Sequence, residues 1–125
     1  MNNKFIIILI LFLIIDIPVI SLNYNMYKNQ YNLINNENII INDSFYISII
    51  ITYLLLAFCF YYFIIIPKES ISKAFLLGLC IYGIYNFTNK ATINKWGMKE
   101  SIIDTLWGGI LFTIIKYIYN LIFTY

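Results

Sequence analysis

The stretch FYISIIITYLLLAFCFYYFIII, residues 45–66, contains neither a charged side chain nor a proline. An α-helix of roughly 20 apolar residues crosses a hydrocarbon core about 30 Å thick, and this stretch is long enough to do so. Its length and composition therefore predict a transmembrane helix. They indicate that the chain lies in a lipid bilayer, which agrees with an overall hydrophobic content of 62% and a charged content of 11%.

Three further segments are long and apolar but carry polar interruptions. The segment before this stretch contains Asp16 and Pro18, the segment after it is rich in tyrosine, and the last carries Asp104 and Lys116. The four predicted transmembrane helices cover residues 5–22, 45–66, 71–88 and 101–123. The fold class is therefore predicted to be all-α, an integral membrane bundle of four helices.

The segments between these helices are polar and are predicted to be loops: a long asparagine-rich loop over residues 23–44, a short turn opened by Pro67, and a lysine-bearing loop over residues 89–100. An even number of spans places both termini on one side of the membrane, together with the Pro67 turn. Lysines occur on both sides, so the positive-inside rule does not fix the orientation. A single domain over residues 1–125 is expected.

The first helix has an alternative interpretation. Lys4, the apolar run that follows it, and the small residues Val19 and Ser21 also suit a signal peptide that would be removed. Asp16 and Pro18 stand late in the segment, and the residues at the cleavage position are not the usual small pair. These features favour a helix that is kept, and the signal peptide stays the alternative.

Composition excludes several classes of function. The chain has no histidine, which is the commonest general base and transition-metal ligand, so we assign no catalytic residue, no metal site and no cofactor. The net charge of +2 comes from scattered lysines and forms no basic patch, so a nucleic-acid partner is not expected. The expected partner is the lipid bilayer.

Polar side chains follow one stripe of the third predicted helix. Tyr82, Asn86 and Asn89 are spaced i, i+4 and i+7, and Tyr85 lies beside them. Such a stripe can be an aromatic belt with hydrogen bonds between helices, each worth about 0.6 to 2 kcal/mol. It can equally line a binding site.

Two aspartates stand within predicted membrane helices. Asp16 lies about a dozen residues into its segment, where an uncompensated aspartate costs about 3 kcal/mol on insertion scales. We expect it to face protein or water. Asp104 precedes Trp107 by three residues, and its alternative role is a helix cap paired with Ser101.

These polar groups are predicted to meet on one side of the membrane. Asp16 lies in the far half of the first helix, the stripe lies at the far end of the third, and Asp104 begins the fourth from that same side. Trp107 and Tyr85 are expected to form the floor of a cleft there. Convergence of polar groups beneath a loop is typical of a membrane binding site. Polar groups that only hold the helices together have the same sequence pattern. The candidate binding residues are Asp16, Tyr82, Tyr85, Asn86, Asn89, Asp104 and Trp107.

Two motifs, YGIYNFTNKATINKW (residues 82–96) and IIDTLWGG (residues 102–109), resemble a known pattern. They look like the small membrane-protein family filed as domain of unknown function 2177, whose hallmark is a Tyr-Gly-x-Tyr-Asp/Asn-x-Thr-Asn-x-Ala-Thr run, a following Trp, and an Asp-x-x-Trp-Gly. The chain departs from the family where Asn86 replaces the preferred Asp and Gly97 replaces Pro. The resemblance implies a four-helix membrane protein that keeps its first helix, with no assigned activity.

Three functions are compatible with these observations. The first is binding or transport of a proton, a cation or a small polar solute by the polar cluster. The second is a structural or assembly protein whose cluster only fixes helix packing. The third is a membrane-embedded enzyme acting on lipid, which we rank last because no nucleophile and base stand in a recognised spacing. Glycines in the last two helices suit contacts within the bundle and contacts in a homo-oligomer equally well.

Overall fold

The computed structural model of the protein describes residues 3–35 and 39–123. Its elements in chain order are α1 (Asn3–Leu22), α2 (Tyr24–Asn35), α3 (Asp43–Phe60), the π-helical turn η1 (Tyr61–Ile65), α4 (Ile71–Thr92) and α5 (Met98–Phe123). Within these residues, four helices are long and apolar enough to cross a membrane when α3 and η1 are taken as one. The predicted all-α class is confirmed, with α4 and α5 extending beyond the predicted bounds.

The prediction of a loop over all of residues 23–44 is wrong, because its first half forms α2. After a break at Asn23, the backbone N–H groups of Met26 and Tyr27 donate to the Asn23 carbonyl and the chain becomes helical again. Gln30 of this helix is buried against the rest of the protein. Asparagine and tyrosine have low intrinsic helix propensity, so contacts with other helices outweigh local preference here.

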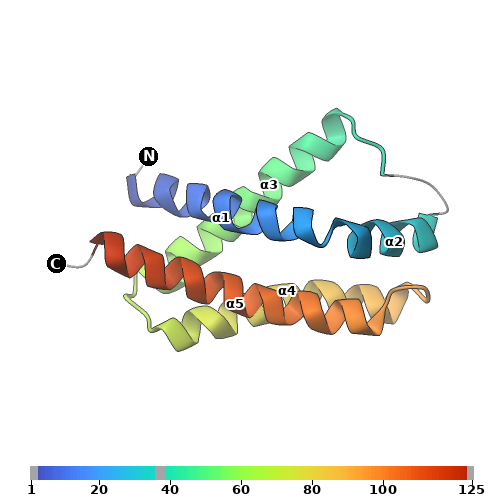
Figure 1. Ribbon diagram of the computed structural model, residues 1–125. Coiled ribbons are helices and arrows are strands. Elements are labelled where there is room, and N and C mark those ends of the chain that lie inside the picture. Colours follow the sequence, from blue (N-terminus) through green and yellow to red (C-terminus); the bar gives the residue numbers. More distant parts are fainter. Residues whose placement is uncertain (1–2, 36–38, 124–125) are drawn as a thin grey trace.

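The helices form an antiparallel bundle in which α4 and α5 lie side by side along their length (Figure 1). Helix α1 packs against both α3 and α5, and α3 crosses the others at a steep angle (Figure 1). Helix α2 continues from α1 toward the end of the bundle where α4 connects to α5. The N-terminal end of α1, the C-terminal end of α5 and the α3–α4 turn share the opposite end, as predicted.

Three phenylalanines hold the centre of the bundle. Phe12 of α1, Phe60 of α3 and Phe112 of α5 are fully buried. Their rings meet edge to face with centroid separations of 5.8, 5.1 and 5.5 Å, an arrangement that aromatic pairs favour. Helix α1 therefore contributes to the core, which favours the interpretation that it belongs to the folded protein.

Glycines set the close contact between α4 and α5. A Cβ atom on Gly78 would overlap the carbonyl oxygen of Gly108, and it would lie 2.7 Å from the Phe112 ring. A Cβ on Gly108 would overlap the side chain of Tyr82. Small residues let membrane helices approach closely because lipid and protein are equally apolar. These glycines therefore serve contacts within the chain.

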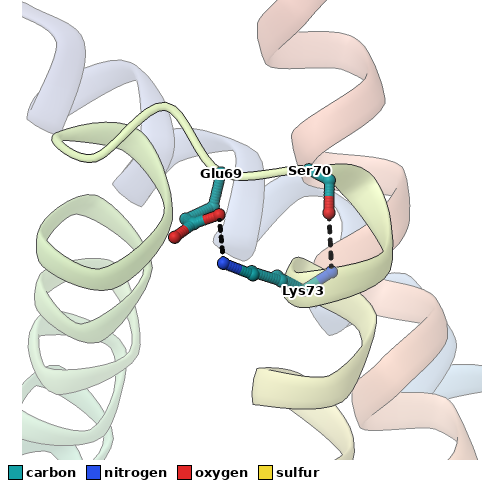
Figure 2. A network of polar contacts seen from close by, with 3 residues as sticks. All are labelled: Glu69, Ser70 and Lys73. Carbon is teal, nitrogen blue, oxygen red and sulfur yellow. Dashed lines mark hydrogen bonds and ion pairs between the residues drawn. The ribbon is translucent and has the colours of Figure 1, made fainter.

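The α3–α4 turn contains a left-handed residue, Lys68, with φ of 57°. The N–H of Glu69 donates to the carbonyl of Ile64 at 2.8 Å, as in a helix end closed by a left-handed residue. Ser70 then caps α4, and its hydroxyl accepts the Lys73 N–H at 3.3 Å, while the ammonium group of Lys73 pairs with Glu69 at 2.7 Å (Figure 2).

Replacing Lys68 with glycine is expected to raise the free energy of unfolding by about 1 kcal/mol, because a left-handed conformation costs other L-residues about that much and costs glycine little. Thermal unfolding of the full chain in detergent measures the change. Lys68→Gln keeps the backbone cost and removes the charge, so it is the matched control. Equal stability of the two variants would contradict the argument.

Candidate functional site

Asp16 lies on α1 with only 4% of its surface exposed. Its Oδ1 atom accepts a hydrogen bond from the Trp107 indole N–H at 2.8 Å, and its Oδ2 atom accepts one from the Tyr53 hydroxyl at 2.9 Å. The Tyr82 hydroxyl makes a further side-chain hydrogen bond to this carboxylate. Asp16 faces protein, as predicted, and it connects α1 to α3, α4 and α5.

Asp104 is the second carboxylate of the cluster and lies on α5. Its Oδ1 atom accepts a hydrogen bond from the Tyr27 hydroxyl at 2.9 Å, and its Oδ2 atom accepts one from the Asn86 amide at 2.6 Å. The same amide nitrogen donates to the backbone carbonyl of Tyr82 at 2.9 Å. Asp104 therefore connects α5 to α2 and α4, so the two aspartates together link all five helices.

The alternative role of Asp104 as a helix cap is wrong. Helix α5 begins at Met98, so Asp104 lies in its second turn. The Ser101 hydroxyl donates to the carbonyl of Gly97 at 2.7 Å, a local bond within the start of the helix. The Asp104 carboxylate instead points to neighbouring helices.

The described side chains that donate to these carboxylates are neutral. Tyr27 is one of these donors. Tyr27 lies on α2, outside the membrane-spanning helices. Burial, and then the charge of Asp104, raise the pKa of Tyr27 above its ordinary value. Both causes disfavour a second negative charge beside Asp104. The Tyr27 hydroxyl therefore remains protonated and holds its hydrogen bond across the physiological pH range.

A cavity of about 410 Å³ lies against both aspartates. Ligand sites in proteins typically have volumes of about 300 to 1,000 Å³, so it is large enough for a small molecule. Four tyrosines and three apolar side chains complete its lining: Tyr24, Tyr27, Tyr31, Tyr82, Ile20, Ile39 and Phe45. The lining therefore combines two carboxylates with aromatic and apolar walls.

A second, much smaller cavity of about 30 Å³ is also lined by Tyr27 and lies between α2, α4 and the start of α5. Glu100 and Asp104 line it, together with two buried side chains, Gln30 and Trp96. The Gln30 amide nitrogen and the Trp96 indole nitrogen have no hydrogen-bond partner within the described residues. The space admits about one or two water molecules, which would satisfy both groups.

The structure brings five of the seven predicted site residues into one hydrogen-bonded cluster: Asp16, Tyr82, Asn86, Asp104 and Trp107. Their proximity follows from the antiparallel course of α1, α4 and α5. Their use as a binding site remains a prediction.

Tyr85 and Asn89 lie beside the cluster, and neither hydrogen-bonds to an aspartate within the described part of the chain. Tyr85 is 51% exposed, and its ring meets Trp96 edge to face at 5.8 Å. It also hydrogen-bonds to Asn89. The expectation that Tyr85 and Trp107 share the floor of one cleft is therefore wrong, since Trp107 faces Asp16 and Tyr85 faces Trp96.

Tyr53 was not among the predicted site residues, although it donates directly to Asp16. It lies within the predicted helix over residues 45–66, which has no charged side chain, so its ring was counted as part of the apolar helix and its hydroxyl was overlooked. The available signal was its depth, because a hydroxyl near the middle of a membrane helix requires a partner. Tyr27 was missed as a site residue because residues 23–44 were expected to form a loop.

Among residues 3–35 and 39–123, no group of three His, Cys, Asp or Glu side chains is placed to hold a metal ion.

Comparison with known proteins gave one result. A family model described as "Predicted membrane protein (DUF2177)" matches residues 1–119. No curated protein and no solved structure matches the chain.

Proposed function

Since the chain belongs to the DUF2177 family of predicted membrane proteins, we propose that this multi-pass membrane protein binds a small organic cation at its two aspartates. The observation that carries the proposal is the pairing of Asp16 and Asp104 with neutral donors only. No lysine is among the described residues that line the 410 Å³ cavity. Two carboxylates therefore share a cavity that supplies no positive charge.

The electrostatics favour a cationic occupant. Ionised carboxylates inside a membrane protein are costly unless a cation or hydrogen bonds compensate them. Asp16 accepts hydrogen bonds from Trp107, Tyr53 and Tyr82. Asp104 accepts hydrogen bonds from Tyr27 and Asn86, and none of these donors carries a positive charge. A bound cation supplies the compensating charge.

The lining favours an organic cation over a bare metal ion. The described residues offer no three-ligand metal group. The tyrosines of the lining present aromatic rings, and ring faces attract ammonium groups through their quadrupoles. Ile20, Ile39 and Phe45 add apolar wall for the methyl or methylene groups of such a ligand. We therefore infer an ammonium compound as the chemical class.

Choline is a suitable probe, and 3,3-dimethylbutan-1-ol is its uncharged analogue of the same shape. The full chain in detergent is expected to show a higher melting temperature with choline, because a ligand that binds only the folded state stabilises it. Asp16→Asn and Asp104→Asn should each weaken choline binding by about tenfold or more. The exposed Asp43 carries the same charge on α3, so Asp43→Asn is the matched control.

Stabilisation of equal size by the alcohol would contradict a cation site. So would choline binding that survives the double Asp16→Asn, Asp104→Asn variant. A response to pH that choline does not alter would identify a proton as the occupant.

The structural function remains the second candidate, because one specific observation supports it. The two aspartates link all five helices through donors on α2, α3, α4 and α5. A purely structural cluster predicts that asparagine variants lose stability in proportion to the hydrogen bonds they disturb and that choline has no effect. The choline experiment therefore distinguishes the structural function from cation binding.

A further inference from the structure

The opposite end of the bundle holds a separate cavity of about 540 Å³, where the N-terminal end of α1, the α3–α4 turn and the C-terminal part of α5 meet. Its polar lining comes from Lys4, Lys68, Glu69, Ser70, Lys116 and Asn120. Among the described residues that line it, three lysines against one glutamate give a positive balance. This cavity shares no lining residue with the cavity at the two aspartates, so the two sites are distinct.

Glu69 does not neutralise this positive balance. Its carboxylate pairs with the ammonium group of Lys73 at 2.7 Å, and Lys73 is not among the residues that line the cavity (Figure 2). Lys73 therefore compensates the negative charge of Glu69. The charges of Lys68 and Lys116 remain for an occupant of the cavity.

Lys116 is the main evidence that this end binds a ligand. It lies within the spanning helix α5 and is only 7% exposed. Its ammonium group lies 5.7 Å from the centroid of the Tyr119 ring, and it has no hydrogen-bond or ion-pair partner within residues 3–35 and 39–123. A buried ammonium group without an anion is costly. Lys116 lines the cavity, so an anion there would relieve that cost.

The start of α4 adds a second attraction for an anion. Ser70 and Ile71 line the cavity, and α4 extends for 22 residues from Ile71. The Ser70 hydroxyl accepts the Lys73 N–H. The N–H groups of Ile71 and Ser72 come before it, and N–H groups at the start of an α-helix have no acceptor inside the helix. The positive end of a helix dipole and free N–H groups favour phosphate.

We propose that this cavity binds a phosphate group, supplied by the headgroup of an anionic phospholipid or by phosphate in solution. A basic pocket between helices at a membrane interface is the setting in which anionic headgroups are recognised. Lys116 contacts the phosphate from α5, Lys68 from the turn and Lys4 from α1. The site is independent of the proposed cation site.

Native mass spectrometry of the full chain in detergent, with short-chain phosphatidylglycerol, inorganic phosphate or chloride at equal ionic strength, tests the proposal. The wild type is expected to retain phosphatidylglycerol or phosphate above the level of chloride. Lys116→Met should weaken this binding by about fivefold, which is the effect of one lysine near an anionic lipid. Lys68→Gln, at an exposed position, should have a similar effect, and it disturbs no buried group.

Lys99→Gln is the matched control, because Lys99 is an exposed lysine at the other end of α5. Retention of phosphatidylglycerol alone identifies a lipid headgroup as the ligand, and equal retention of inorganic phosphate identifies free phosphate. No retention above chloride would overturn the proposal. So would binding that Lys116→Met and Lys68→Gln leave unchanged, or that Lys99→Gln weakens to the same extent.

Discussion

Replacing Asp16 with alanine is expected to lower the free energy of unfolding by about 1 to 4 kcal/mol, whereas Asp16→Asn should change it by no more than about 1 kcal/mol. Alanine leaves the Tyr53 and Tyr82 hydroxyls and the Trp107 indole N–H without their shared acceptor inside the protein. The lower figure reflects the modest strength of hydrogen bonds measured in membranes, and the upper figure reflects the cost of donors left unpaired between the helices.

Asparagine preserves the hydrogen bonds because its side chain has the same shape. Its oxygen can accept from Trp107, and its amide can donate to the Tyr53 oxygen. It also removes a buried negative charge, which offsets part of any loss. Thermal unfolding of both variants in one detergent gives the comparison, and Asp43→Asn at an exposed position of α3 controls for the change of charge.

The double Asp16→Asn, Asp104→Asn variant separates the two candidate functions most sharply. If it melts higher than the wild type and no longer responds to choline, the carboxylates are retained for binding at the expense of stability. A variant that fails to insert, or that melts far below the wild type, would show that the charges themselves maintain the fold. That second result would remove the main support for the cation site.

Replacing Gly78 with alanine is the second change with a large expected effect, a loss of about 1 to 3 kcal/mol. The new Cβ would overlap the Gly108 carbonyl oxygen, which is backbone and cannot rotate away. Helices α4 and α5 must then separate. Because Asn86 and Asp104 face each other across this contact at 2.6 Å, the same change should weaken the site.

Gly83→Ala is the matched control on the same helix. A Cβ at Gly83 would lie 3.3 Å from a methyl group of Thr105, a contact that a small side-chain movement relieves. Alanine also favours the helix over glycine by about 1 kcal/mol, so this variant should be neutral or more stable. Thermal unfolding measures the stability of the two variants. Equal losses of stability would show that the close contact at Gly78 matters no more than the contact at Gly83.

Part of the candidate site could be predicted from residue spacing. Tyr82 and Asn86 are one turn apart on α4, and Asp104 with Trp107 are one turn apart on α5, so each pair shares a face. The antiparallel course of the helices then places both faces at one end of the bundle. Tyr85 was predicted to lie beside this stripe and to share a cleft with Trp107. In the structure it faces Trp96, because one residue of offset from Asn86 rotates a side chain by about 100°.

Tyr53 and Tyr27 could not be predicted as partners of the two aspartates. Tyr53 stands 37 residues from Asp16, and Tyr27 stands 77 residues from Asp104. Nothing in local sequence specifies such a pairing, since it depends on the angle at which α3 crosses α1 and on the helical form of α2. Tertiary contacts determine both.

The sequence by itself predicted a membrane protein with four helices long and apolar enough to cross a bilayer, and the described residues contain four such helices. Hydrocarbon thickness fixes the length of an apolar helix and requires its backbone groups to bond internally. The sequence also determined which end of the bundle holds the aspartates. Only the tertiary structure decided which donors face them, that α2 covers this end as a helix, and that Lys116 opens into a basic cavity at the other end. Hydrophobic length is a local property of the chain, whereas hydrogen-bond partners depend on helix rotation and crossing angle, which close packing between distant residues sets.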